Sequence, residues 1–170
     1  MTTTTTTTEP AVGLRVLVGG VGYRFLRDGS VGPWLTDRWE GRTDNGMEVE
    51  DVSYHPVGLH QNLEDRPPSD RIVLVASMAR GRPPGTVTAY RWDGVLPPVE
   101  KIQDRVSEAV TGVIELDNTL IVCAAFGSLP ADVRVVEVEP EDEGWGEGFS
   151  DTITAILPEV LETVWSFTRR

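Results

Sequence analysis

Two segments of the chain are apolar at almost every position, and this feature most constrains the fold. The first runs from Leu14 to Gly20 and the second from Arg71 to Met78, and both are rich in valine. A strand with one exposed face alternates apolar and polar residues, whereas a strand that is covered on both faces does not. We therefore predict that these segments are strands of a parallel sheet with helices on both sides.

The other segments complete an alternation of strands and helices. Further strands are expected at 47–54, 86–92 and 133–138. Helices are expected at 58–65, 101–110 and 120–126, from Val31, and from Ser150 to near the end of the chain. The predicted fold class is α/β, a three-layer α/β/α sandwich around a mostly parallel twisted sheet of about five strands.

Several local details follow from side-chain chemistry. Ser30 and Asp117 are natural N-caps for the helices that follow them, and Pro158 is expected to kink the last helix. The strand at 86–92 follows the second apolar strand after a short turn, which suggests a hairpin-like connection. The glycines after the first strand match no phosphate-binding pattern, so we interpret them as a tight strand-to-helix turn.

Length and composition bound the organisation of the chain. Its 170 residues suit one domain, which we place at 13–170, after a threonine-rich tail at 1–12 that we predict to be disordered. No apolar run is long enough to cross a bilayer, and a single cysteine, Cys123, excludes an internal disulfide. The chain therefore has the features of a cytoplasmic protein. Cys123 lies in an apolar run, so we expect it to be buried rather than catalytic.

The charge of the chain limits its partners. Asp and Glu number 27 against 15 Lys and Arg, which gives a net charge of −12. Such a surface repels nucleic-acid phosphates and anionic membranes, so we expect neither as a partner. A protein partner is expected, and a homo-oligomer is compatible with the sequence. The best candidates for contact with a partner are Trp34 and Trp145, because exposed tryptophans mark interfaces.

Three groups of residues occur in the order found in a known family. The first is Leu17–Pro33 (LVGGVGYRFLRDGSVGP), and the second is Asp70–Ser77 (DRIVLVAS) with Pro84–Val87 (PGTV) after it. The third is the Leu129-Pro130 pair followed by VVEVEP at 135–140 and GWGEGFS at 144–150. Together they resemble the hydrogenase maturation proteases, whose first loop has the form GVGNxLxxDDGxGP. The resemblance runs from about Leu14 to Trp165.

The resemblance implies an activity and a site. Members of this family are α/β/α proteins, and the active ones remove a C-terminal peptide from the large subunit of nickel–iron hydrogenases after nickel insertion. Three groups contact the nickel: an acid in the first loop, an Asp at the end of the second strand, and a His before a later helix. In this chain the corresponding positions are Gly29, Ala76 and the region from Gly112 to Glu115, which holds no histidine.

These substitutions suggest a degenerate member of the family. Gly and Ala side chains offer no ligand to a metal ion, so we expect no metal, no cofactor and no catalytic residue. The first hypothesis is a protein without proteolytic activity that acts as a protein-binding or assembly module. The second is an active endopeptidase whose metal ligands are relocated to Asp28, His60 and Glu115. A third is an unrelated small α/β hydrolase with a similar glycine loop.

Simpler roles are available to several of the candidate residues. For Asp28 we favour a structural role, in which it caps the helix near Val31 or binds the glycine turn. For His55 and His60, which lie on one loop, we favour packing or surface roles over metal binding. Glu115 stays open as a replacement carboxylate, and the acids between Glu137 and Glu147 are interpreted as a solvated loop.

Overall fold

The computed structural model describes residues 13–42 and 46–169, so the tail predicted at 1–12 lies outside the described residues. The strands are β1 (Val16–Val21), β2 (Met47–Asp51), β3 (Arg71–Ser77), β4 (Val87–Arg91) and β5 (Asp132–Val138). The helices are α1 (Val31–Trp39), α2 (Pro56–Glu64), α3 (Val99–Val110), α4 (Leu116–Ala125) and α5 (Asp151–Phe167). A short 3-10 helix, η1 (Arg27–Ser30), precedes α1.

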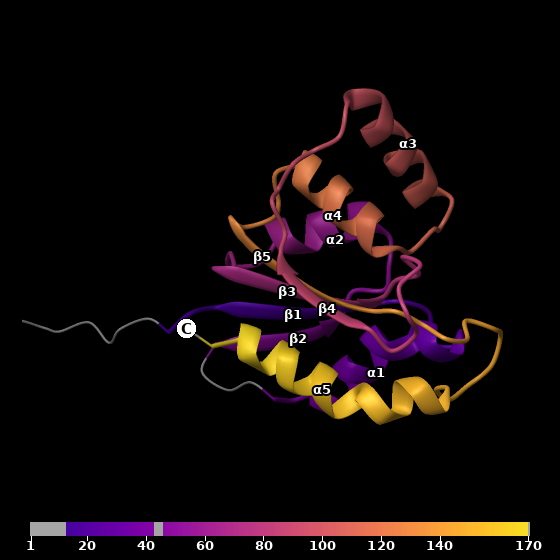
Figure 1. Cartoon of the computed structure of the whole chain (residues 1–170). Helices are drawn as coiled ribbons and strands as arrows, with labels where there is room; N and C mark the ends of the chain where they lie inside the picture. Colours follow the sequence, from indigo (N-terminus) through magenta and orange to yellow (C-terminus); the bar gives the residue numbers. More distant parts are fainter. Residues whose placement is uncertain (1–12, 43–45, 170) are drawn as a thin grey trace, which may run out of the picture.

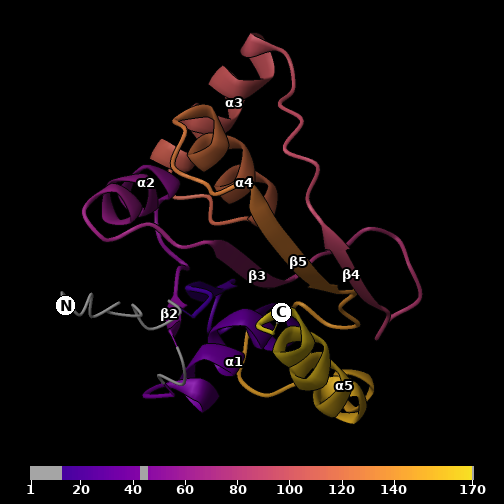
Figure 2. The ribbon, with the colours of Figure 1, turned by 90° about the vertical axis from the view of Figure 1, so that its left-hand side faces the viewer.

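The strands form one sheet in the order β2-β1-β3-β5-β4. All neighbours are parallel except β4, which runs antiparallel to β5. Helices α1 and α5 cover one face of the sheet, and α2, α3 and α4 lie on the other, where α3 packs outside α4 (Figures 1 and 2). The predicted three-layer α/β/α sandwich with a mostly parallel sheet of five strands is therefore confirmed.

The two apolar segments form strands at the centre of the molecule. Every residue of β1 is buried, and so is every residue of β3 except Ser77. One core cluster joins the sheet to α1 and α5, and a second joins it to α2 and α4. The absence of alternation in the two segments thus reflects burial on both faces, as expected.

The glycines after β1 allow close packing of the first helix. A Cβ added to Gly20 would lie 2.2 Å from the carbonyl oxygen of Gly32, and one added to Gly32 would lie 2.5 Å from the backbone nitrogen of Val21. No side chain fits in either place, so the backbone of α1 rests directly on the end of β1. The connection from β1 to α1 contains η1 and is therefore longer than the tight turn that the sequence indicated, but its glycines are needed for the close packing.

Three local expectations are wrong. Strand β4 does not form a hairpin with β3, because β5 lies between them. Ser30 makes no side-chain cap for α1; its hydroxyl donates to the carbonyl of Arg27 at 2.7 Å. Asp117 is not the N-cap of α4, because that residue is Glu115 and Asp117 lies inside the first turn. The carboxylate of Asp117 binds Arg80 instead. The kink at Pro158 stays a prediction; this proline lies within α5, which continues on both sides of it.

Candidate functional site

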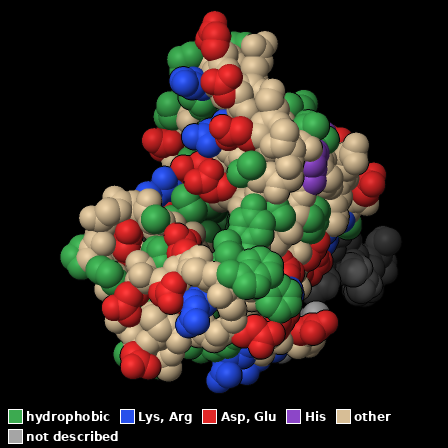
Figure 3. Space-filling model, turned by 90° about the vertical axis from the view of Figure 1, so that its right-hand side faces the viewer, with side chains coloured by type: hydrophobic (Ala, Val, Ile, Leu, Met, Phe, Trp, Pro, Cys, Tyr) green, Lys and Arg blue, Asp and Glu red, His purple; other side chains and the backbone are tan. Residues whose placement is uncertain are grey.

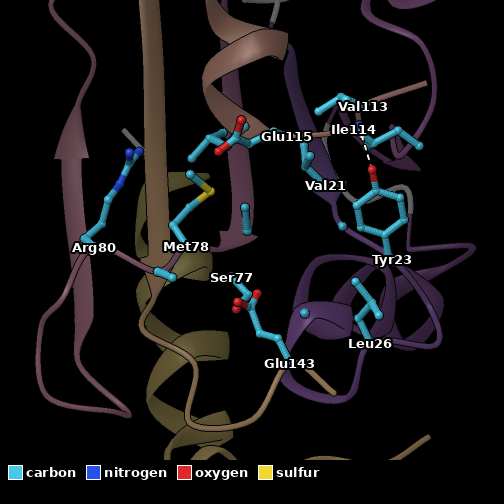
Figure 4. A pocket seen from close by; sticks show the side chains of 15 residues that line it. Val21, Tyr23, Leu26, Ser77, Met78, Arg80, Val113, Ile114, Glu115 and Glu143 are labelled. Atoms are coloured by element: carbon cyan, nitrogen blue, oxygen red, sulfur yellow. Dashed lines mark hydrogen bonds between the residues drawn. The ribbon is translucent and has the colours of Figure 1, made fainter. Parts of the chain in front are cut away.

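A cleft of about 470 Å³ opens beyond the carboxyl ends of β1 and β3 (Figure 4). The chain leaves β1 toward α1 on one face of the sheet and leaves β3, by way of β4, toward α3 and α4 on the other. Ligands of open α/β sheets bind at such a reversal, because the diverging loops leave a crevice between them. The loop after β1, the loop after β3, the segment before α4 and Glu143 provide the walls of the cleft.

The structure brings the three family ligand positions together at this cleft. Gly29 lies in the loop after β1, Ala76 is at the end of β3, and Val113, Ile114 and Glu115 precede α4; all of them line it. Positions that are far apart in sequence therefore converge on one cleft. Gly29 and Ala76 have no atom that could bind a metal ion, so nickel does not fit this set of side chains.

The alternative ligands Asp28, His60 and Glu115 are not brought together. Glu115 lines the cleft, but Asp28 and His60 do not. The ring of His60 stacks on Phe126 with the centroids 4.9 Å apart, and its Nε2 lies 3.6 Å from the carboxylate of Glu64. Within the described part of the chain, no group of three His, Cys, Asp or Glu side chains is placed to hold one metal ion.

Asp28 is a fully buried structural residue. Its carboxylate accepts hydrogen bonds from the backbone nitrogens of Glu141, Asp142 and Ser150 at 2.9, 2.8 and 2.8 Å, and from the Ser150 hydroxyl at 2.9 Å. We expected Asp28 to cap α1 or to bind the glycine turn. This expectation is wrong, because the partners of its carboxylate lie in the segment before α5. Asp28 instead ties the loop after β1 to the segment that leads into α5, and we call this set of contacts the latch.

Glu143 is a cleft residue that the sequence did not single out. Its Oε1 lies 3.7 Å from the point that a Cβ on Gly29 would occupy, so it reaches the place where the family has its first acid. Burial and the nearby carboxylates of Asp28 and Glu139 all raise the pKa of Glu143 above its ordinary value. The sequence grouped it with the other acids of a solvated loop, and no spacing rule separates it from them.

Arg80 is a cationic residue of the cleft, and its charge is paired with two carboxylates of the protein. Its Nη2 donates to Asp117 at 2.7 Å and to Glu137 at 2.9 Å, and these bonds raise the pKa of the guanidinium. Arg82 and the hydroxyl of Tyr90 also bind the Glu137 carboxylate, at 2.8 and 2.9 Å. Burial opposes ionisation of Glu137, but these three donors outweigh it and hold its pKa below the ordinary range.

The two tryptophans expected to contact a partner lie in different surroundings. Trp145 is 81% exposed, and its ring lies 6.0 Å from that of Phe25, which is 49% exposed. Trp34 packs edge-on against Phe149, with centroids 5.7 Å apart, at the side of the core that α1 and α5 cover. Trp145 is thus presented to the surroundings, whereas Trp34 is partly covered.

Two further residues have local roles. His55 is the N-cap of α2, since its Nδ1 accepts a hydrogen bond from the backbone nitrogen of Val57 at 3.1 Å. Cys123 is fully buried, and burial raises the pKa of its thiol to about 12. A thiol in this state is not a nucleophile, which agrees with the expectation from the sequence.

Comparison with known proteins identifies structural relatives. The hydrogenase maturating endopeptidase HybD from Escherichia coli is 25% identical, with a TM-score of 0.67 over 90% of this chain and 91% of that one. A second endopeptidase from Escherichia coli is 24% identical, with a TM-score of 0.65 over 89% of this chain and 90% of that one. A hydrogenase 2 maturation peptidase from a Thaumarchaeota archaeon is 21% identical, with a TM-score of 0.63 over 90% of this chain and 97% of that one.

These relatives confirm the resemblance that the three sequence motifs indicated: the chain has the fold of the hydrogenase maturation proteases. No family model matches the sequence. No curated protein matches it either. Among the helices described, none combines the length and the apolar character that crossing a bilayer requires.

Proposed function

We propose that this protein keeps the framework of a hydrogenase maturation protease and binds a segment of a protein partner in its cleft without cleaving it. The observation that carries the proposal is the composition of the cleft. All three family ligand positions line it, and two of them, Gly29 and Ala76, have no donor atom. Any metal ion there would keep mostly water ligands, and its affinity would be correspondingly low.

The framework around the cleft supports a retained binding role. The latch of Asp28 holds the loop after β1. The bonds of Arg80 to Asp117 and Glu137 join the loop after β3 to α4 and to β5, respectively. The walls of the cleft are therefore fixed, although the family's ligands are absent from it. Fixed walls favour binding, because little conformational entropy is lost when a partner enters.

The alternative is an active endopeptidase with relocated ligands, and the geometry gives it less support. Of its three residues only Glu115 lines the cleft, and the oxygens of Asp28 are occupied by four hydrogen bonds. By analogy with HybD, the first partner to test is a hydrogenase large subunit. We place the protein in the cytoplasm, with a protein partner and no cofactor.

The test is incubation of the full chain with the nickel-loaded precursor of a hydrogenase large subunit, followed by intact mass spectrometry and size-exclusion chromatography. The Escherichia coli precursor with HybD is the positive control. We expect the precursor to keep its tail and to co-elute with the protein. Clipping of the tail that the Glu115→Gln variant abolishes would contradict the proposal and establish the alternative.

A further inference from the structure

Strand β4 is the last strand of the sheet, so one of its edges has no strand beside it in the described part of the chain (Figure 2). At its end, the backbone nitrogen of Trp92 donates to the carbonyl of Val133 at 2.9 Å. Successive residues of an antiparallel strand turn their N–H and C=O groups alternately toward the partner strand and away from it. The backbone groups of Val87, Ala89 and Arg91 therefore point away from β5, and we call them the free edge.

The free edge has little protection against the addition of another strand. Sheets usually guard such an edge with prolines, bulges or charged side chains, because unpaired backbone groups recruit a further strand. The first four residues of β4, VTAY at 87–90, include no proline and no charge, and Ala89 is exposed. The unpaired groups recur at every second residue, which is the spacing that an added strand matches.

Positive charge is concentrated at one end of the free edge. Nε of Arg71 lies 2.7 Å from the carboxylate of Asp132, and Nε of Arg134 lies 3.1 Å from it. Nε of Arg91 lies 3.8 Å from the same carboxylate, and its side chain is 65% exposed. Arg91 and Arg134 are also direct cross-strand neighbours, a position in which like charges destabilise a sheet. A second carboxylate beside Arg91 would therefore be stabilised.

This basic end of the sheet is separate from the cleft. Arg71 begins β3 and Arg91 ends the antiparallel strand β4, so both lie where the parallel strands start. The cleft lies where the parallel strands end, and acidic side chains surround an apolar area on that side of the molecule (Figure 3). The free edge and the cleft therefore offer opposite charges to a ligand.

We propose that an extended segment of a protein partner adds to the free edge of β4 as an antiparallel strand, with an aspartate or glutamate opposite Arg91. Its backbone completes the hydrogen bonds of the free edge, and its carboxylate pairs with the guanidinium of Arg91. The residue opposite Ala89 comes two positions later and lies on the same face, where the small side chain leaves room for a bulky apolar one. The inference goes beyond the proposed function, because it concerns a different surface.

A second copy of the chain does not meet both requirements of this surface. If two β4 strands paired along their full length, Arg91 of each copy would lie opposite Val87 of the other, and no carboxylate would reach the arginines. Both copies would also carry a net charge of −12. An acidic, extended segment of a different protein supplies the backbone groups and the carboxylate together.

The test measures binding of short fluorescein-labelled peptides to the full chain by fluorescence anisotropy. The first peptide has glutamate, threonine, valine and threonine in that order at its centre, which places the valine opposite Ala89. Replacing the glutamate by lysine, or adding an N-methyl group to the valine, should weaken binding at least about tenfold. The matched control has the N-methyl group on the threonine after the valine, whose N–H points away from β4, and should bind like the first peptide. Equal affinity of all four peptides, or no binding of the first at millimolar concentration, would overturn the inference.

Variants of the protein locate the binding surface. Ala89→Pro removes an N–H that makes no bond within the sheet, so it should weaken binding of the first peptide about tenfold in a folded protein. Its matched control, Ala89→Ser, keeps the N–H and should bind normally. Unchanged affinity of the Ala89→Pro variant, with circular dichroism showing it to be folded, would contradict the inference.

A reversal of charge tests the arginine without depending on stability. Arg91→Glu should weaken binding of the glutamate peptide and strengthen binding of the lysine peptide, an exchange that a folding defect does not produce. Lys101→Glu makes the same change of charge on the exposed surface of α3, and should leave the preference for glutamate unchanged. If both variants reverse the preference, only the net charge matters and the inference is wrong.

The outcomes are independent of the proposed function. Clipping of the large-subunit precursor would end the non-cleaving function without affecting peptide binding at β4. If the precursor forms a complex without clipping but the four peptides bind alike, the proposed function stands and this inference fails. A dimer of the protein that Ala89→Pro dissociates would identify a second copy as the occupant, and would likewise overturn the inference.

Discussion

Glu137 and Glu143 belong to one acidic segment, yet their surroundings are opposite. The carboxylate of Glu137 is 1% exposed and binds Arg80, Arg82 and Tyr90, which hold its pKa low. Glu143 lies at the cleft, where burial and two neighbouring carboxylates raise its pKa. The comparison shows that an acid with satisfied hydrogen bonds stabilises this fold, whereas an acid without compensation costs stability and is available to a ligand.

The same contrast separates Asp28 from Gly29. Asp28 is buried and makes the latch, and the next residue is a family ligand position without a side chain. The carboxylate of Asp28 therefore supports the framework, and the position after it offers no atom that could bind a metal ion.

The largest effect is expected for Asp28→Ala. The change leaves three backbone N–H groups and the Ser150 hydroxyl without their acceptor in a buried place, so it should lower the free energy of unfolding by about 3 kcal/mol or more. Denaturant unfolding followed by circular dichroism measures it. Asp28→Asn, which keeps the shape and one acceptor, should lose less. A loss for Asp28→Ala below about 1 kcal/mol would mean that the latch does not hold the two loops together.

Glu137→Gln should come next, with a loss of about 2 kcal/mol. It removes the charge that compensates Arg80 and Arg82 beside the core and weakens the bond from Tyr90. The matched control is Glu141→Gln, because Glu141 is an exposed acid of the same segment whose backbone alone joins the latch. Equal stability of the two variants would mean that the buried, hydrogen-bonded carboxylate of Glu137 contributes no more to stability than the exposed carboxylate of Glu141.

Asp117 and Glu137, which form ion pairs with Arg80, should both make the protein less stable as the pH falls. In the folded protein, Arg80 lowers the pKa of Asp117, and the pKa of Glu137 is also lowered, so both bind protons more weakly than in the unfolded chain. Their contribution is complete above the ordinary values of 3.8 and 4.5 and is lost as the pH falls through the folded-state values. Unfolding free energies measured from neutral to acidic pH should decrease below about pH 4.5. A flat profile there would contradict the role given to these ion pairs.

The smallest effect, and the opposite sign, is expected for Glu143→Gln. The raised pKa means that the ionised form is disfavoured in the folded protein, so its removal should stabilise the protein at neutral pH. The gain should be only about 0.5 kcal/mol, because the side chain of Glu143 is only partly desolvated at the cleft and is still exposed enough for water to screen its charge. As the pH falls through the folded-state pKa of Glu143 toward the ordinary 4.5, the wild type becomes protonated and the advantage should disappear. Loss of stability in this variant would show that the carboxylate of Glu143 stabilises the fold and would contradict the prediction.

Local sequence patterns predicted the central strands well and long-range pairings poorly. The apolar runs of β1 and β3 fix their burial on two faces, because apolar side chains at every position cannot face water. Strand β4 was assigned to β3 because the two are close in sequence, but the residues of an edge strand do not encode which neighbour they pair with.

The site was predicted in part for a similar reason. The sequence pointed to Gly29 and Ala76 because the surrounding pattern resembles the family, and both residues line the cleft. The partners of Asp28 lie more than a hundred residues away, and helix-capping rules consider only the nearest residues. Glu143 reaches the cleft only because the latch folds its loop over Gly29, and nothing in its immediate sequence shows this.

Nickel titration calorimetry tests the central claim most directly, with the wild type compared with a variant that restores the missing donors. The variant combines Gly29→Glu, Ala76→Asp and Ile114→His, which place two carboxylates and an imidazole at positions that line one cleft. The account predicts no tight binding by the wild type and one-to-one binding by the restored variant, provided that circular dichroism shows both to be folded. Tight one-to-one binding of nickel by the wild type would contradict it.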